Sequence, residues 1–314
     1  MKAYAIDEFG KAGSVRDLPD PSPGDGEVRV RVAAASVNPF DSAVINGYLK
    51  DYMEHRFPLV PCGDLAGVVD AVGSNVDGLK VGDRVFGTVG RGFQGEGSLA
   101  ELALAGAGGL ALTPAGLSDA EASTFPVAGV SGLMMVEAAA LEPGDTVVVV
   151  GASGGVGGFA VQVAAARGAH VVGVTTATNA DYVRGLGAAE IIDRAAGDVL
   201  EQLKRAHPDG VAALIDTASD GEGLLHLAGA VRAGGHVLSM KRSADVDALA
   251  ALGLVGANVA AVINAERLTE LAAMVNSGKL RAPAIHEYPL AQAAEALAAV
   301  SGQHGAGKLV VVIE

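Results

Sequence analysis

The residues best suited to chemistry lie in one segment, Thr146–Gly158, which reads TVVVVGASGGVGG. Gly151, Gly154 and Gly157 are spaced three apart, and Ala152 completes the pattern A-x-G-x-x-G. A side chain at Gly154 would hold the backbone away from a pyrophosphate, and Gly157 lets a following helix pack on the preceding strand. Free N–H groups at the start of that helix would bind the phosphates. We therefore predict a dinucleotide site formed by Ser153, Gly154, Gly155, Val156 and Gly157.

The chain contains 44 glycines, so a purely structural glycine turn is the alternative interpretation. An apolar strand, Val147–Val150, is predicted before the turn, and an apolar helix, Gly155–Arg167, is predicted after it. This strand–turn–helix context favours dinucleotide binding.

The end of the next predicted strand, His170–Thr175, should contact the ribose of the dinucleotide. NAD enzymes place Asp or Glu there, roughly 20 residues past the glycines. This chain instead has a polar, uncharged run: Thr175, Thr176, Thr178 and Asn179. The first acid, Asp181, is expected on the following helix, and Arg194 can add positive charge at the same edge. Because no carboxylate would repel a 2′-phosphate, we favour NADPH over NADH; the alternative is that the threonines cap the helix.

The second half of the chain alternates strands and helices. Besides those above, we predict a helix over Ala180–Leu186 and three strands, at Glu190–Ile192, Val211–Ile215 and His236–Ser239. Continuous valine runs indicate strands buried on both faces, as in a parallel sheet with helices outside. Ser118, with Glu121 at the capping-box position, should begin a helix that runs through Phe125. The pattern predicts an α/β fold with a doubly wound parallel sheet of Rossmann type over residues 118–284.

The first third of the chain is rich in predicted β-strands and is typical of a small, irregular β-barrel. The expected strands are Met1–Ile6, Glu27–Ala35, Leu65–Val72 and Val85–Gly87. A lone strand at Gly307–Ile313 should return to this domain. We therefore assign residues 1–117 and 285–314 to one discontinuous domain.

Composition limits the classes of partner. The chain has 314 residues, half of them hydrophobic, which suggests two domains with sizeable cores. The net charge of −14 argues against a nucleic-acid partner and against a polybasic membrane contact. No uninterrupted apolar stretch reaches spanning length. Cys62 is the single cysteine, which excludes an intrachain disulfide and fits a reducing compartment, so we expect a cytoplasmic protein.

Five motifs in order resemble the medium-chain dehydrogenase/reductase superfamily, and within it the zinc-independent quinone oxidoreductases (the zeta-crystallin-like group). They are VNPFD at 37–41, FPLVPCGDLAGVV at 57–69, VGDRVFG at 81–87, GASGGVGGFAVQ at 151–162 and GKLVVVI at 307–313. The resemblance covers nearly the whole chain and implies a GroES-like barrel beside the Rossmann domain. Two positions depart from it: Cys62 stands where the family usually has glycine, and Asn179 where many NADPH-using members carry lysine. Arg194 stands where some members place a tyrosine beside the 2′-phosphate.

The resemblance also implies further site residues. Asn38 matches an asparagine near the nicotinamide, and Ser131 matches a threonine that lines the nicotinamide pocket. Thr217 and Ser239 lie at strand ends that face the cofactor, and Lys308 matches a frequent basic position at the rim of the site.

No zinc is expected. The metal-dependent branch of the superfamily needs thiolate and imidazole ligands. Here only Cys62 can supply sulfur, and no histidine lies in the segment GDLAG at 63–67, where that branch has a His-Glu pair. We interpret Cys62 as a small buried residue.

Without a Lewis acid, a conjugated acceptor is the easier substrate, because hydride adds to carbon and the charge spreads onto oxygen. We therefore expect reduction of a quinone or an α,β-unsaturated carbonyl compound. Tyr48 is the candidate proton or oxyanion donor, by resemblance to enoyl-thioester reductases; alternatively its ring only lines the pocket. Lys50, Tyr52 and His55 are neighbours that can substitute for it.

Two other functions remain open: an enoyl-thioester (enoyl-CoA or enoyl-ACP) reductase, and a non-catalytic NADPH-binding scaffold. A thioester reductase would need clustered Lys or Arg for the carrier phosphates, and the chain offers few. Members of the superfamily often pair nucleotide domains edge to edge. The apolar stretch Leu249–Ile263 can supply such an edge, for a homodimer, or belong to the core.

Overall fold

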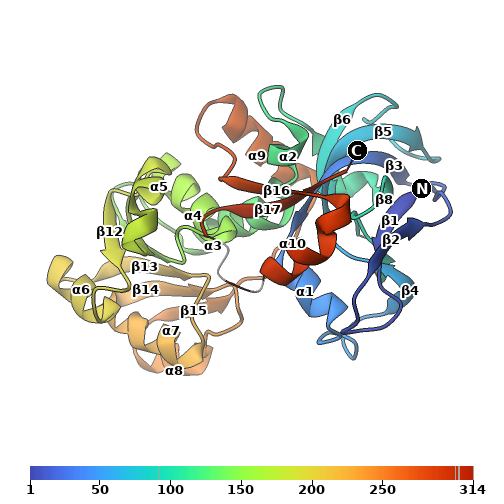
Figure 1. Cartoon of the computed structure of the whole chain (residues 1–314). Coiled ribbons are helices and arrows are strands. Elements are labelled where there is room, and N and C mark those ends of the chain that lie inside the picture. The colour runs from blue at the N-terminus through green and yellow to red at the C-terminus, as the bar shows by residue number, and fades with distance from the viewer. Residues whose placement is uncertain (91, 301, 303–304, 314) are drawn as a thin grey trace. The chain divides into compact units, whose positions relative to one another are not determined.

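The computed structural model describes residues 1–90, 92–300, 302 and 305–313. The chain forms two compact units (Figure 1). The first unit comprises Met1–Val127, Ile263–His304 and Lys308–Glu314, and the second comprises Ala128–Val262 and Gly305–Gly307. Within the described part of the chain, no helix has the length and apolar character needed to cross a membrane.

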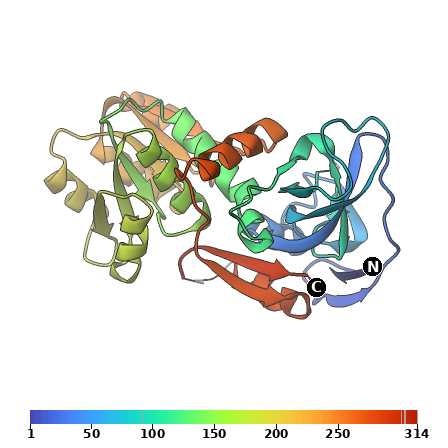
Figure 2. The same ribbon diagram turned by 90° about the horizontal axis from the view of Figure 1, so that it is seen from above.

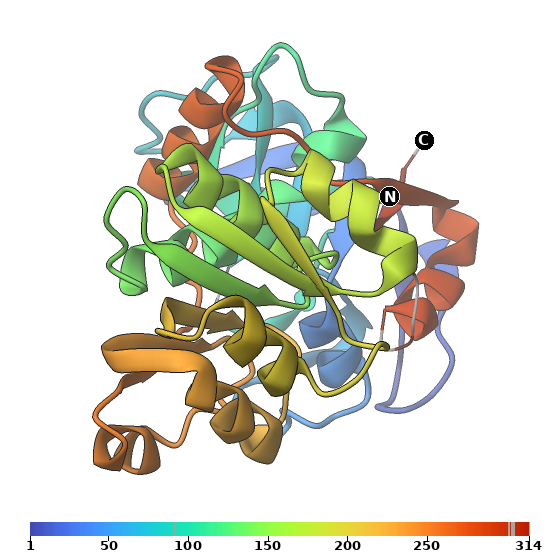
Figure 3. The same ribbon diagram turned by 90° about the vertical axis from the view of Figure 1, so that its left-hand side faces the viewer.

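The second unit contains a six-stranded parallel sheet in the order β12-β11-β10-β13-β14-β15. Its strands are β10 (Thr146–Val150), β11 (His170–Thr175), β12 (Glu190–Asp193), β13 (Val211–Asp216), β14 (Val231–Ser239) and β15 (Val255–Asn258). The helices around it are α3 (Val130–Ala138), α4 (Gly155–Ala166), α5 (Ala180–Gly185), α6 (Val199–Ala206), α7 (Gly221–Leu227) and α8 (Val246–Ala251). In Figure 1, α4 and α5 lie on one side of this sheet and α6, α7 and α8 on the other; Figure 3 shows the same unit from its side. This is the predicted Rossmann sheet.

The valine runs explain why these strands are central. Val148, Val172 and Leu214 belong to one hydrophobic core cluster and are inaccessible to solvent. The strand order reverses between β10 and β13, so the glycine turn after β10 lies at the topological switch point of the sheet. Ligands of open α/β sheets bind at this point, outside the carboxyl ends of the strands.

The first unit contains the GroES-like, seven-stranded sheet. Along its main path the strands are β16 (Ile285–Pro289), β17 (Lys308–Val312), β3 (Glu27–Val37), β5 (Asp64–Val72), β6 (Arg84–Thr88) and β9 (Leu110–Leu112), and β8 (Leu102–Gly106) pairs with β3. Two small sheets join β1 (Lys2–Ala5) to β2 (Ser14–Asp17) and β4 (His55–Val60) to β7 (Gln94–Glu96). The expected return of the last strand is observed, because β17 pairs antiparallel with β3 and parallel with β16, as Figure 2 shows for β16 and β17.

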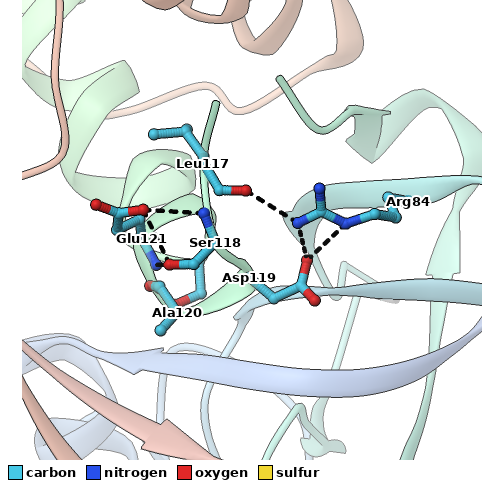
Figure 4. A network of polar contacts seen from close by, with 7 residues as sticks. Arg84, Leu117, Ser118, Asp119, Ala120 and Glu121 are labelled. Carbon is cyan, nitrogen blue, oxygen red and sulfur yellow. Dashed lines mark hydrogen bonds and ion pairs between the residues drawn. The ribbon is translucent and has the colours of Figure 1, made fainter. Parts of the chain in front are cut away.

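Helix α2 (Asp119–Ala122) begins at Ser118, as the capping-box pattern predicts. The Glu121 backbone N–H donates to Ser118 Oγ at 3.2 Å, and the Ser118 N–H donates to Glu121 Oε2 at 2.9 Å (Figure 4). Arg84 anchors the same turn by donating to Asp119 Oδ1 at 2.7 Å and to the Leu117 carbonyl at 3.0 Å. The helix is shorter than predicted, because a π-helical turn at Phe125–Gly129 follows it and leads into α3.

The structure differs from the sequence-based domain boundaries at two places. Residues 118–127, with α2, and residues 263–284, with helix α9 (Ala265–Asn276), are predicted in the Rossmann domain but belong to the first unit, where α9 contacts β9. Its buried face consists of Leu268, Leu271 and Ala272. An apolar stripe on a helix predicts that the helix packs on something, but it carries no information about which sheet receives it.

Helices α1 (Pro39–Ile45) and α10 (Ala293–Ala299) complete the first unit.

Candidate functional site

The glycine turn after β10 has the geometry that the fingerprint requires. Gly151 has a φ of +77°, a region that favours glycine. A Cβ on Gly157 would lie 2.2 Å from the Gly151 carbonyl oxygen, whereas a Cβ on Gly154 would come no nearer to that atom than 3.3 Å. Close packing of the turn on the helix therefore requires Gly157. Gly154 has only this one tight neighbour, and the absence of a side chain there lets a ligand approach the backbone.

Helix α4 begins directly at this turn, with Gly154 as its N-cap. The first N–H groups of a helix lack intrahelical acceptors and attract anions. The predicted contacts Gly155, Val156 and Gly157 form the first turn of α4. These residues fit a dinucleotide pyrophosphate.

A short glycine segment, Gly305–Gly307, lies along the same turn. The Gly307 N–H donates to the Ser153 carbonyl at 2.9 Å, and Gly154 and Gly307 form a parallel β-bridge. Asn179 Nδ2 donates to Ser153 Oγ at 3.3 Å. The predicted residues Ser153 and Asn179 are thus neighbours, although 26 positions separate them in the chain.

The carboxyl end of β11 brings the predicted ribose-binding residues together. Thr175 is buried, and its carbonyl accepts the Arg194 backbone N–H at 2.8 Å. Thr176 Oγ1 and Thr178 Oγ1 are 2.9 Å apart and share a hydrogen bond. Thr176 is the N-cap of the 3-10 turn Ala177–Asn179, and Asn179 is the N-cap of α5. In the part of the chain that the structure describes, neither side chain makes a capping hydrogen bond. Asp181 lies on α5, as predicted, and its exposed carboxylate pairs with Arg184 at 3.0 Å.

Three further predicted residues lie in the second unit with hydroxyls in different surroundings. Ser131 is buried in α3. Thr217 Oγ1 donates to the Val150 carbonyl at 2.8 Å, which links β13 to β10. Ser239 is buried at the end of β14, and its Oγ accepts backbone N–H groups from Lys241 at 3.2 Å and Ser243 at 3.0 Å. The Ser239 hydroxyl therefore shapes the loop after β14.

The first unit contains a buried polar cluster around Asn38. Asn38 Nδ2 donates to Asp64 Oδ2 at 2.9 Å, and the Asn38 backbone N–H donates to Asp41 Oδ2 at 2.7 Å. Lys308 Nζ donates to Asn38 Oδ1 and, at 3.0 Å, to the Val37 carbonyl. Lys308 is only 5% exposed, and its side chain points into the first unit. Strand β17 alternates its side chains, and the register with β3 turns Lys308 toward Asn38.

Burial shifts the pKa of every titratable group in this cluster. Loss of water raises the pKa of Asp64 to about 7 and that of Asp41 to about 6, and the nearby Lys308 ammonium opposes both shifts. Burial lowers the pKa of Lys308, although Asp64 and Asp41 oppose that change. Burial also raises the pKa of the Cys62 thiol well above its ordinary value, with a further contribution from Asp41.

Cys62 is buried, as predicted. Its φ is +72°, the left-handed region that glycine adopts readily, which explains why a glycine suits this position. Cys62 also lines a hollow of about 220 Å³ in the first unit, together with Met53, Val89 and Phe93. The Arg56 guanidinium carbon lies 3.6 Å from the centroid of the Phe93 ring.

Tyr48 follows α1 and is 75% exposed in the structure; its backbone N–H donates to the Ala43 carbonyl at 3.0 Å. The neighbouring Tyr52 is 83% exposed.

Asp41 and Asp64 were not predicted as site residues from the sequence, although both lie in motifs singled out there. The available signal was a carboxylate at the start of an otherwise apolar strand, in DLAGVV.

Within the residues that the structure describes, no group of three or more His, Cys, Asp or Glu side chains is arranged to hold a metal ion.

Comparisons with known proteins agree with this architecture. Residues 24–115 match the family described as alcohol dehydrogenase GroES-like domain, and residues 186–311 match the family described as zinc-binding dehydrogenase. The chloroplastic quinone-oxidoreductase QR1 of Triphysaria versicolor is 30% identical over 99% of this chain and 98% of its own length. The 2-methylene-furan-3-one reductase of Solanum lycopersicum is 30% identical over 90% of this chain and 70% of its own length.

A solved structure, the quinone oxidoreductase from Coxiella burnetii, has a TM-score of 0.88 and 27% identity, and the match covers 100% of this chain and 99% of that one. Together with the glycine turn, these similarities identify an oxidoreductase fold built for a nicotinamide cofactor. The chain belongs to the quinone oxidoreductase family of the medium-chain dehydrogenase/reductase superfamily.

Proposed function

We propose that this protein uses NADPH to reduce a quinone or an α,β-unsaturated carbonyl compound, by hydride transfer without zinc. The observation that carries the proposal is the glycine turn at the switch point, followed by a second strand whose end has hydroxyl and amide groups and no carboxylate. A 2′-phosphate would meet Thr176, Thr178 and the exposed Arg194 at that edge. Ser153 and Gly154 to Gly157 would hold the pyrophosphate.

The bound dinucleotide supplies the hydride. The chain must then orient the acceptor, stabilise the charge that develops on its oxygen and deliver one proton. Asn38, Ser131, Thr217 and Ser239 remain candidates for the nicotinamide surroundings, and Tyr48 remains the candidate donor. The hollow beside Cys62 offers the aromatic wall of Phe93 to a planar acceptor.

Two observations support a conjugated acceptor and a zinc-free site. The tomato relative is named for 2-methylene-furan-3-one, a ketone conjugated to a methylene group. In this chain Lys308 already places a positive charge beside Asp41, Asp64 and Cys62, where a divalent cation would be repelled.

The test is consumption of NADPH with 1,4-benzoquinone and with 2-cyclohexenone, by protein dialysed against a chelator, with NADH as the alternative donor. Turnover that favours NADPH and survives the chelator supports the proposal. Dinucleotide binding without turnover on either acceptor would instead indicate a scaffold. Turnover confined to an enoyl thioester would indicate a thioester reductase.

Tyr48→Phe tests the donor role. If the phenol donates the proton, kcat with 2-cyclohexenone falls by about 100-fold, while the KM for NADPH is retained. Tyr52→Phe, alone and combined with Tyr48→Phe, tests whether this similarly exposed neighbour substitutes for Tyr48. An unchanged kcat in Tyr48→Phe would leave the ring as a pocket wall only.

We further propose a homodimer through β15 and a cytoplasmic location. Strand β15 is an edge strand of the sheet, and an edge presents unpaired N–H and C=O groups to another strand. The single cysteine fits a reducing compartment.

A further inference from the structure

The carboxamide of Asn38 is held at both ends in a fixed orientation. An ammonium can only donate hydrogen bonds. Lys308 Nζ therefore bonds to Oδ1 of Asn38, which leaves Nδ2 to donate to Asp64 Oδ2 at 2.9 Å. All three side chains are at most 5% exposed, so water offers no competing partner.

Asn38 is also the residue from which helix α1 starts. It is the N-cap of α1, its backbone N–H donates to Asp41 Oδ2 at 2.7 Å, and the preceding Val37 carbonyl accepts from Lys308 at 3.0 Å. Helix α1 leads into Gly47, with a φ of +75°, and then into Tyr48. The position of Asn38 therefore determines the position of the first turn of α1, and through α1 that of the segment that continues to Tyr48.

Lys308 reaches this point from far along the chain. It lies 270 positions after Asn38 and enters the cluster because β17 pairs with the end of β3. The groups that face its ammonium are the carboxyls of Asp41 and Asp64 and the thiol of Cys62. If Lys308 only balanced the charges of these groups, its ammonium would not need the hydrogen bonds to Asn38 Oδ1 and to the Val37 carbonyl.

We propose that Lys308 is a positioning residue: with Asp64, its buried ammonium fixes the Asn38 carboxamide and the start of α1, and so holds the segment Asn38–Tyr48 in its working conformation. The catalytic consequence rests on the proposed reductase function. The conformational consequence does not.

The test compares Lys308→Met, Lys308→Arg and the double variant Lys308→Met/Asp64→Asn. Lys308→Met should lower kcat with 2-cyclohexenone by roughly 100-fold, because small displacements of positioned groups have effects of that size. The KM for NADPH should change little, and Lys308→Arg should recover part of kcat. The double variant removes one negative charge with the positive one, so it should recover thermal stability without recovering kcat.

Hydrogen exchange measured by mass spectrometry on the segment 38–48 gives a readout that does not depend on activity. Exchange in this segment should rise in Lys308→Met and in the double variant, and should stay near the wild-type level in Lys308→Arg. Recovery of both stability and kcat in the double variant would overturn the proposal, since Lys308 would then only balance charge. If the wild type shows no turnover, the reductase function fails, and unchanged exchange over 38–48 in Lys308→Met would overturn the positioning role separately.

Discussion

Asp41, Asp64 and Lys308 form a cluster of buried ionisable side chains in the first unit. Each is buried, and each makes hydrogen bonds to Asn38. Unpaired charges in such a place would cost several kcal/mol, so the three groups depend on one another. The sequence contained all three in recognisable motifs. It did not reveal their proximity, because the contact joins strands that are distant in the chain.

Asp64 should give the protein a measurable pH dependence of stability. Its folded pKa of about 7 lies above the ordinary aspartate value of 3.8, so the folded state holds more protons than the unfolded state between these values. The free energy of unfolding should therefore fall as the pH rises from about 4 to about 7. Asp64→Asn cannot titrate and should reduce this fall by roughly 4 kcal/mol. Asp41, with a pKa of about 6, should retain part of it.

Urea unfolding at a series of pH values measures this effect. Asp181→Asn is the control, because its carboxylate is 99% exposed. Equal slopes in Asp64→Asn and the wild type would show that Asp64 is not held protonated by the fold.

At the scale of elements, local pattern predicted strand and helix positions well. Strand β11 has the expected bounds, and β10, β13 and α4 differ from expectation by one residue. These elements have strong valine periodicity or glycine ends, which are properties of neighbouring residues. Helix α9 and the π-helical turn after α2 were not predicted correctly, because the surfaces they pack on are set by distant parts of the chain.

Gly154 and Gly157, in the turn between β10 and α4, have different roles, although both are glycines of the same fingerprint. Gly157→Ala places a Cβ 2.2 Å from a backbone oxygen, so the protein without ligand should lose about 2 kcal/mol of stability. Gly154→Ala meets no such obstacle and should cost at most about 1 kcal/mol. It should weaken NADPH binding by about tenfold or more, because its methyl group would face the pyrophosphate.

Thermal unfolding without ligand, followed by dinucleotide titration, distinguishes the two variants. Wild-type affinity in Gly154→Ala would mean that the pyrophosphate does not approach this residue.

At the scale of the molecule, the second unit is an almost continuous insertion into the first. Residues 128–262 supply its six-stranded sheet and its hydrophobic core, and only Gly305–Gly307 are added from the end of the chain. The predicted two-domain organisation differs from this arrangement at residues 118–127, which include α2, and at residues 263–284, which include α9. The stretch Leu249–Ile263 proved to be mixed: Leu249 is core, whereas Leu252, Val255 and Val262 are exposed.

Val255→Lys tests the proposed dimer. A lysine on edge strand β15 should convert the homodimer to a monomer, because strand pairing would bury its charge. Light scattering coupled to size-exclusion chromatography measures the mass. Leu225→Lys, on the exposed part of α7, is the control and should leave the mass unchanged. A wild-type protein that is already monomeric, or a Val255→Lys dimer, would exclude this contact.

The pairing of β17 with β3 has a consequence for biosynthesis. A ribosome delivers β3 early, yet Leu309, which pairs with Val37, emerges only after the whole second unit. During translation the end of β3 at Ala34–Val37 lacks its pairing with β17, and Asp41 and Asp64 lack the ammonium of Lys308 until that strand is made. Multidomain chains generally fold from the N-terminus as they are made. Here the inserted unit can complete its core first, and the unit that starts the chain is finished last.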